Sequence, residues 1–244
     1  YLSRHCPNAL RWAQANEFQP HHLLDLANVM RMGRDANKDI PRSDVTKLEA
    51  IDRGSFGSIH KASYRGADVA MKCIGKEGRL HLRDAMRPVF LELSAILGLN
   101  HPRVVKFEGL VFHFPDSVTE PAEIDLLFEF CGRGNLYNNL HRKRILPDIS
   151  QRIHIACQVA EGMRYLHSQS IIHRDLNGNN VIFDAHMDAK ICDFGCARRI
   201  GPTGYMTPTT ISGSPSYMSP EQLTGADRLT LKSDVWAMAV VLWE

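Results

Sequence analysis

The order of strand-like and helix-like patterns along the chain most narrowly limits its fold. Three runs rich in β-branched and apolar residues, 45–51, 58–64 and 68–74, follow one another with glycine-containing turns between them. This spacing is typical of an antiparallel meander. Two further strand-like runs cover 104–112 and 124–130, and the apolar period that follows them is that of helices. The sequence therefore predicts a β-rich part followed by an α-rich part.

Three segments carry the apolar period of an amphipathic helix. The first begins near Leu23 and gives way to a polar stretch, 34–43, that indicates a linker. The second follows Pro88, which we expect in the first helical turn, where proline is tolerated. The third begins after Asp148, which forms a capping-box pattern with Gln151. The β-rich part thus contains one helix of its own.

Length and charge exclude several classes of protein. A chain of 244 residues corresponds to one large domain or two lobes. Its 29 basic and 27 acidic residues leave a net charge of +2, which argues against nucleic acid or a membrane surface as a partner. The longest apolar run, 235–243, is too short for a membrane-spanning helix within this stretch. The six cysteines form no C-x-x-C pair, so we expect reduced thiols and a cytoplasmic location.

Gly54 and Gly57 lie between the first two predicted strands. Glycine lets backbone N–H groups approach phosphate oxygens because it has no Cβ. The same spacing also occurs in ordinary hairpin turns. At this level, both a phosphate-binding loop and a plain turn remain open.

Lys72 ends an apolar run in the third predicted strand. A buried ammonium group requires a partner. Glu92, on the predicted helix, supplies one if that helix packs on the sheet. A solvated strand lysine is the alternative that the residue on its own favours.

Asp175 and Asn180 lie five residues apart in one polar segment, and Asp193 follows further along the chain. The carboxylate of Asp175 is suited to accepting a hydroxyl proton. The oxygens of Asn180 and Asp193 are ligands that Mg²⁺ prefers when phosphate and water complete its coordination. These three residues therefore indicate phosphoryl chemistry that uses a hard cation.

The ordered set of motifs resembles that of eukaryotic protein kinases. The resemblance covers about residues 45–244 and is closest to the tyrosine-kinase-like group. It rests on the glycine loop, Val69-Ala70-Met71-Lys72, Glu92, His173-Arg174-Asp175, Asn180, Asp193-Phe194-Gly195, Ser219-Pro220-Glu221 and Asp234-Val235-Trp236.

The resemblance implies a role for each matching residue. Lys72 would hold the ATP phosphates with Glu92 as its partner, Asp175 would act as the catalytic base, and Asn180 and Asp193 would bind Mg²⁺. Glu129 to Cys131 would form the hinge that hydrogen-bonds adenine, and Phe128 would occupy the bulky gate position behind it. The packing spine would consist of Ile96, Phe107, His173 and Phe194. The implied nucleotide-binding positions are Ile51, Gly54, Ser55, Phe56, Gly57, Ile59, Ala70, Lys72, Glu129, Cys131, Ile182 and Asp193.

Three positions depart from the kinase pattern. Asp52 stands at the first glycine position and places a negative charge near the phosphates. Asn177 replaces the lysine usual in serine/threonine kinases, so a cation near the transferring phosphate is missing. Ser219 replaces an alanine with little expected consequence. Ser214, in a Gly-Ser-x-x-Tyr-Met pattern, nevertheless favours serine and threonine substrates.

The segment between Arg198 and Ser216 contains many hydroxyl groups, which an upstream kinase could modify. A phosphate there could pair with Arg174 and Arg198, whereas a solvated loop residue is the commoner alternative for any one hydroxyl. The candidates are Thr203, Tyr205, Thr207, Thr209, Thr210, Ser212 and Ser216.

These observations predict an α+β, bilobal protein-kinase-like fold. Its parts are an N-terminal extension and linker, 1–42, a β-rich N-lobe with one helix and the hinge, 43–131, and a mainly α-helical C-lobe, 132–244. The chain starts at Tyr1 and stops in an apolar helical run, so we expect a fragment with an incomplete C-lobe that is insoluble or molten on its own.

The expected function is ATP-dependent phosphorylation of protein substrates on serine and threonine. A nucleotide-binding pseudokinase that acts as a scaffold is the alternative, because of Asp52 and Asn177. A P-loop or dinucleotide-binding enzyme is disfavoured because its glycine motifs are absent from the sequence.

Overall fold

The computed structural model describes residues 1–54, 57–74, 81–143, 147–208 and 210–244. It divides the chain into two compact units. The first comprises residues 1–93 and 106–130, and the second comprises residues 94–105 and 131–244. Two of the predicted nucleotide-binding residues, Ser55 and Phe56, and the candidate hydroxyl of Thr209 lie outside the described residues.

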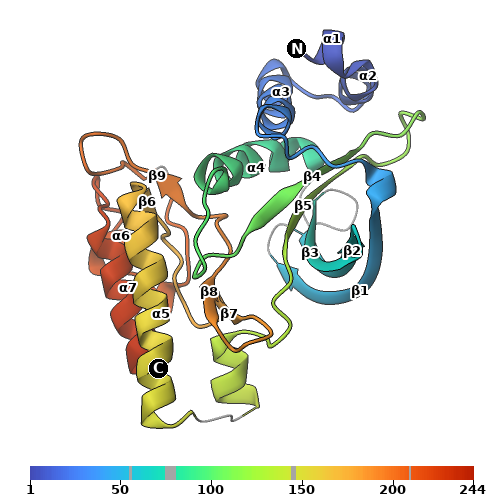
Figure 1. Ribbon diagram of the computed structural model, residues 1–244. Helices are drawn as coiled ribbons and strands as arrows, with labels where there is room; N and C mark the ends of the chain where they lie inside the picture. Colours follow the sequence, from blue (N-terminus) through green and yellow to red (C-terminus); the bar gives the residue numbers. More distant parts are fainter. Residues whose placement is uncertain (55–56, 75–80, 144–146, 209) are drawn as a thin grey trace. The chain divides into compact units, whose positions relative to one another are not determined.

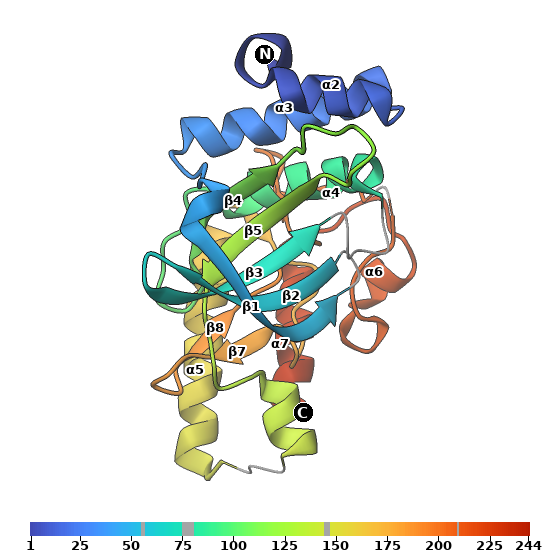
Figure 2. The same cartoon turned by 90° about the vertical axis from the view of Figure 1, so that its right-hand side faces the viewer.

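The first unit is built on a five-stranded antiparallel sheet with the strand order β1-β2-β3-β5-β4 (Figure 2). All five predicted strands are present, and the α+β class is confirmed. The strands are β1 (Val45–Gly54), β2 (Gly57–Tyr64), β3 (Ala67–Ile74), β4 (Phe107–His113) and β5 (Glu123–Glu129).

The hairpin between β1 and β2 requires glycine at one position. Gly54 and Gly57 are register partners at the end of the two strands. A Cβ on Gly57 would lie 1.8 Å from the carbonyl oxygen of Cys73 on β3, which is an impossible contact. The closeness of two backbones therefore fixes this glycine.

Helix α4 (Leu82–Ile96) begins six residues before Pro88, so the prediction that the helix starts at this proline is wrong. Leu82, Ala85, Met86 and Val89 are all buried, and they lie at the i, i+3, i+4 and i+7 positions of one helical face. Burial of this face extends the helix through a proline that removes one backbone N–H donor.

Three helices precede the sheet in the same unit. They are α1 (Leu2–His5), α2 (Pro7–Ala15) and α3 (Pro20–Asp35), and α3 lies beside α4 and the β4 edge (Figures 1 and 2). The helix predicted near Leu23 is thus confirmed as α3. A short 3₁₀ turn, η1 (Arg42–Asp44), leads into β1. Ile40 and Val45 belong to the core cluster on one face of the sheet, with Met71 and Leu127.

The second unit is mainly helical, and its described residues include two short two-stranded pairings, β6 with β9 and β7 with β8. The capping box predicted at Asp148 is present, because Asp148 and Gln151 exchange backbone-to-side-chain hydrogen bonds of 3.0 and 2.8 Å. The long helices α5 (Ile149–Ser168) and α7 (Lys232–Trp243) lie side by side (Figure 1). The other elements are η2 (Asn138–Arg142), β6 (Ile171–Ile172), β7 (Val181–Phe183), β8 (Ala189–Ile191), β9 (Arg198–Arg199), η3 (Pro215–Tyr217) and α6 (Pro220–Leu223).

Candidate active site

In the first unit, Lys72 on β3 and Glu92 on α4 form the ion pair that the sequence suggested. The Lys72 Nζ atom donates to both carboxylate oxygens of Glu92 at 2.9 Å. The side chains are 14% and 5% exposed. A bidentate, mostly buried pair has the geometry in which both charges are compensated. Lys72 is therefore held in place and is not a solvated strand lysine.

The remaining predicted nucleotide-binding residues of this unit lie on the strands of the sheet. Ile59 on β2 is the register partner of Lys72, and Ala70 on β3 is the register partner of Phe128 on β5. Ile51 is exposed on β1. Glu129 forms two hydrogen bonds with Lys106. The Lys106 N–H donates to Glu129 Oε1 at 2.7 Å, and the Glu129 N–H donates to the Lys106 carbonyl at 2.9 Å.

In the second unit, Asp175 lies in the loop between β6 and β7 and is held by hydrogen bonds to its carboxylate. Its Oδ1 accepts from the Ser214 N–H at 2.8 Å and from Asn177 Nδ2 at 3.0 Å. Its Oδ2 accepts from Asn180 Nδ2 at 3.2 Å. Three neutral donors thus fix both oxygens of the carboxylate.

Asn177 takes part in this network with its whole side chain. It is 3% exposed, and its Nδ2 also approaches the Ser214 Oγ at 3.2 Å. Its Oδ1 accepts from the Asn179 N–H at 2.9 Å. The position expected to lack a cation is therefore occupied by an amide that supplies hydrogen bonds without charge.

Asn180 and Asp193 are brought together by the β7–β8 hairpin. The Cys192 N–H donates to the Asn180 carbonyl at 3.0 Å, so Asp193 follows the residue paired with Asn180. Asp193 has a φ of 58°, and this left-handed backbone is uncommon for a residue other than glycine. Ile182, a further predicted nucleotide-binding residue, lies on β7 between these positions, and Cys131 is the first residue of this unit's main segment.

The predicted spine residues of this unit are buried and packed. Phe194 is 1% exposed, and its ring meets the His173 ring edge-on at a centroid distance of 5.4 Å. Ile96 is also buried in this unit, whereas Phe107 belongs to the first unit and packs edge-on against Phe128.

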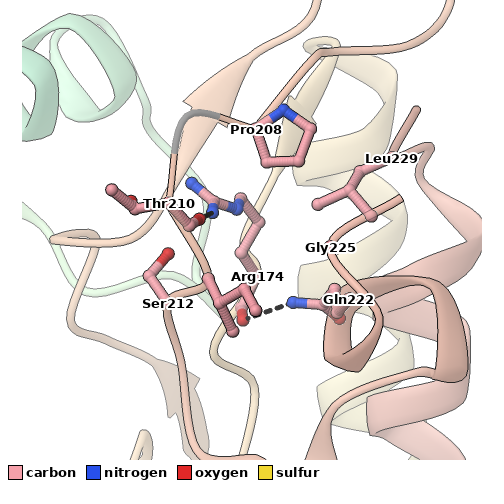
Figure 3. Close-up of a pocket in the computed structure, with 8 residues that line it drawn as sticks. Arg174, Pro208, Thr210, Ser212, Gln222, Gly225 and Leu229 are labelled. Carbon is pink, nitrogen blue, oxygen red and sulfur yellow. Dashed lines mark hydrogen bonds between the residues drawn. The ribbon is translucent and has the colours of Figure 1, made fainter. Parts of the chain in front are cut away.

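Arg174 borders a small pocket of about 180 Å³ under the segment that precedes α6 (Figure 3). Its guanidinium donates to the carbonyls of Cys196 and Thr210 at 3.3 and 3.1 Å. Burial lowers the pKa of Arg174 from its usual value. The Gln222 Nε2 atom donates to the Arg174 carbonyl at 3.1 Å. The guanidinium thus ties the segment around Thr210 to the loop that carries Asp175.

Asp234, known from the sequence only as part of the motif Asp234-Val235-Trp236, anchors this loop, and that role was not predicted. Asp234, in the first turn of α7, is 1% exposed and accepts from the N–H groups of His173 and Arg174 at 2.8 and 2.9 Å. His167 Nε2 lies 2.9 Å from the same carboxylate. The available signal was an acidic residue at the start of the most apolar helical run in the chain.

The motif Ser219-Pro220-Glu221 lies at the start of α6. Glu221 accepts from the Ser233 hydroxyl at 2.8 Å. Ser219 is 1% exposed and lies in a capping box with Gln222, so this departure from alanine gives α6 an N-cap.

Neither a metal cluster nor a membrane span is evident in the part of the chain that the structure describes. No group of three or more His, Cys, Asp or Glu side chains is arranged to bind a metal ion there. Within the same residues, no helix has the length and apolar character needed to cross a bilayer.

The fold, the Lys72–Glu92 ion pair and the hydrogen-bonded loop around Asp175 define a protein kinase domain. Residues 45–244 match the family described as "Protein tyrosine and serine/threonine kinase". The chain therefore belongs to the protein kinase family, and the resemblance deduced from the motifs is confirmed. ATP is the cofactor that this family uses.

The relatives of the chain are serine/threonine kinases of the tyrosine-kinase-like type. Serine/threonine-protein kinase CTR1 of Arabidopsis thaliana is 36% identical over 210 residues, which cover 84% of this chain and 24% of CTR1. Serine/threonine-protein kinase TNNI3K of Homo sapiens is 31% identical over 225 residues, which cover 88% of this chain and 25% of TNNI3K. The chain thus spans about a quarter of the length of these relatives.

Proposed function

We propose that this protein transfers the γ-phosphoryl group of ATP to serine and threonine hydroxyls of protein substrates. The observation that carries the proposal is the environment of Asp175. Its carboxylate is held through both oxygens by Asn177, Asn180 and the Ser214 N–H. A carboxylate fixed in this way is suited to orienting a substrate hydroxyl and accepting its proton.

The other site residues supply charge. Lys72, held by Glu92, is placed to bind phosphate oxygens of ATP. The donor set of Asn180 and Asp193 fits Mg²⁺, because it offers an amide oxygen and a carboxylate on adjacent ends of one hairpin. When bound, Mg²⁺ would neutralise negative charge on the phosphates. Asn180 donates its amide hydrogens to Asp175, which leaves its oxygen for the ion.

Serine and threonine are the proposed acceptors because the relatives that align with most of this chain are named as serine/threonine kinases. Ser214, adjacent to Asp175, supports the same assignment through its place in the Gly-Ser-x-x-Tyr-Met pattern. The six cysteines form no C-x-x-C pair, and this spacing supports a reducing, cytoplasmic location as part of the proposal.

Substitution of the two aspartates tests the proposal in the full-length protein. Asp175→Asn should reduce kcat for peptide phosphorylation by about 10²–10⁴-fold while ATP binding stays nearly unchanged. Asp193→Asn should weaken Mg²⁺-dependent ATP binding as well. Asp227→Asn, at an exposed carboxylate of the same unit, is the matched control and should leave both unchanged. Phosphoamino-acid analysis of the product identifies the acceptor.

Two outcomes would contradict the proposal. If Asp175→Asn retained wild-type turnover, the catalytic role assigned to Asp175 would be wrong. ATP binding without turnover by the unsubstituted protein would favour the pseudokinase alternative.

A further inference from the structure

Side chains of α2 and of its C-cap residue hold the backbone of the connection between β4 and β5. Arg11 Nη2 donates to the Asp116 carbonyl at 2.8 Å, Trp12 Nε1 to the Glu120 carbonyl at 2.7 Å and Asn16 Nδ2 to the Val118 carbonyl at 3.0 Å. The Trp12 side chain is buried and meets the Phe114 ring edge-on. The extension therefore docks on this connection through specific hydrogen bonds.

The segment after α3 closes the edge of the sheet. The Leu110 N–H on β4 donates to the Lys38 carbonyl, and the Leu110 carbonyl accepts from the Ile40 N–H, both at 2.7 Å. Lys38 Nζ also donates to the Phe107 carbonyl at 3.1 Å. Pairing of this kind occupies the edge of a sheet. Residues 38–40, within the expected linker, are thus attached to the N-lobe, and the predicted boundary at residue 42 stays a prediction.

Helix α3 reaches α4 through an ion pair. Asp25 on α3 is 8% exposed, and its Oδ1 lies 3.3 Å from Arg87 Nη1 on α4. Arg87 precedes Glu92 by five residues, and Pro88 lies between them. Because a proline inside a helix removes a backbone hydrogen bond, the part of α4 that carries Glu92 gains from an external contact beside Pro88.

We propose that α1–α3 act as an intramolecular positioning element for the Lys72–Glu92 ion pair. Asp25 is the positioning residue, and it acts through Arg87 and the turn of α4 that contains Pro88. The contacts of α2 and of residues 38–40 attach α1–α3 to the rest of the first unit. This attachment fixes the position of the Asp25 carboxylate beside α4. This inference rests on the proposed function, in which Glu92 holds Lys72 for binding ATP phosphates.

The test compares charge removal with charge exchange in the full-length protein. Asp25→Ala and Arg87→Ala should each raise KM for ATP two- to fivefold, with a smaller change in kcat, and should speed hydrogen exchange of the α4 amides. Exchange of the two charges, Asp25→Arg with Arg87→Asp, should restore most of the ATP affinity. Asp35→Ala, at an exposed carboxylate at the end of α3, is the matched control and should change neither quantity.

Hydrogen exchange separates this inference from the proposed function, because it requires no turnover. If the wild-type protein showed no phosphoryl transfer, the proposed function would fail, while faster exchange in α4 of Asp25→Ala would still support the positioning role. Unchanged α4 exchange and ATP affinity in Asp25→Ala would overturn the inference. A charge-exchanged double variant that folds with the wild-type Tm but binds ATP as weakly as the single variants would also overturn it.

Discussion

The two units each bury a carboxylate, and the two environments are opposite. Asp125 on β5 is 2% exposed, and its Oδ1 has no hydrogen-bond partner among the described residues. Asp234 on α7 is 1% exposed and accepts from the N–H groups of His173 and Arg174. Burial raises the pKa of Asp125 to about 6, although a hydrogen bond from Cys73 opposes the shift.

The difference in hydrogen-bond partners decides whether a buried carboxylate destabilises the folded state or fixes a loop. A carboxylate that lacks sufficient partners in the interior destabilises the folded state when it ionises. A carboxylate that satisfies backbone donors fixes the conformation of the loop that supplies them. Asp234 therefore holds the loop that carries Asp175, whereas Asp125 costs stability at neutral pH. Substitutions at the two sites should have effects of opposite sign.

The largest expected effect comes from Asp234→Ala. Loss of the carboxylate leaves the N–H groups of His173 and Arg174 buried without acceptors, at a cost of about 1–3 kcal/mol each, so the free energy of unfolding should fall by about 2–6 kcal/mol. Phosphoryl transfer should fall at least as sharply as in Asp175→Asn, because Asp175 follows directly. Urea unfolding and peptide phosphorylation measure the two effects.

Asp234→Asn sharpens this prediction because it keeps one acceptor oxygen. Its loss of stability should lie between those of the wild type and Asp234→Ala. If Asp234→Ala unfolded at the wild-type urea concentration, the anchoring role would be wrong. Asp227→Asn again serves as the exposed control.

Asp125→Asn should stabilise the protein at neutral pH. The pKa of Asp125 is about 6 in the folded state against 3.8 as its ordinary value. The folded state therefore binds more protons than the unfolded state between these values, and the stability contributed by Asp125 falls as pH rises through this window. The amide of Asp125→Asn does not ionise. Above pH 7 the free energy of unfolding of this variant should therefore exceed that of the wild type by up to about 3 kcal/mol, at 1.36 kcal/mol per pKa unit.

The pH dependence of the gain distinguishes the proton effect from a packing effect. The advantage of Asp125→Asn should be near zero at pH 4 and should reach a plateau above pH 7. Other charged groups near Asp125 are Glu123 on β5, Arg42 in η1 and Lys47 on β1. Asp68→Asn, at an exposed carboxylate on β3 that pairs with Lys61 at 2.8 Å, is the control and should not gain stability as pH rises. A gain independent of pH would assign the effect to packing.

The contacts around Asp175 were predictable from the sequence because they are local, whereas the Lys72–Glu92 pair, 20 residues apart, was inferred from the need of a buried ammonium for a partner. Asn177 and Asn180 reach Asp175 over two and five residues, so one motif contains both donors and acceptor. The strands were also predictable, because their apolar alternation and glycine turns are local signals.

The contacts that were missed join distant segments. Asp234 lies 61 residues from His173, and Asp25 lies 62 residues from Arg87. No spacing rule selects such partners, because tertiary packing decides which helix faces meet. The start of α4 was missed for a related reason: the buried face from Leu82 to Val89 outweighs the usual preference of proline for the first turn.

The smallest expected effect concerns Asn177, which extends the comparison to the carboxylate of Asp175. Asn177→Ala removes the donor to Asp175 Oδ1 and to the Ser214 hydroxyl. Loss of one such hydrogen bond is worth about 1–1.5 kcal/mol, which lowers kcat about tenfold if it acts in the transition state. KM for ATP should change less than twofold. Asn179→Ala, at the exposed neighbouring amide, is the matched control.

Asn177→Lys then separates hydrogen bonding from charge. The lysine ammonium can donate to Asp175 and Ser214 as the amide does, and it adds the positive charge that the kinase pattern has at this position. Because positive charge near the transferring phosphoryl group stabilises the transition state, kcat should equal or exceed the wild-type value. A kcat as low as that of Asn177→Ala would show that the planar amide, which also accepts from the Asn179 N–H, is required by its shape. In that case the neutral network around Asp175 would be a specific property of this chain.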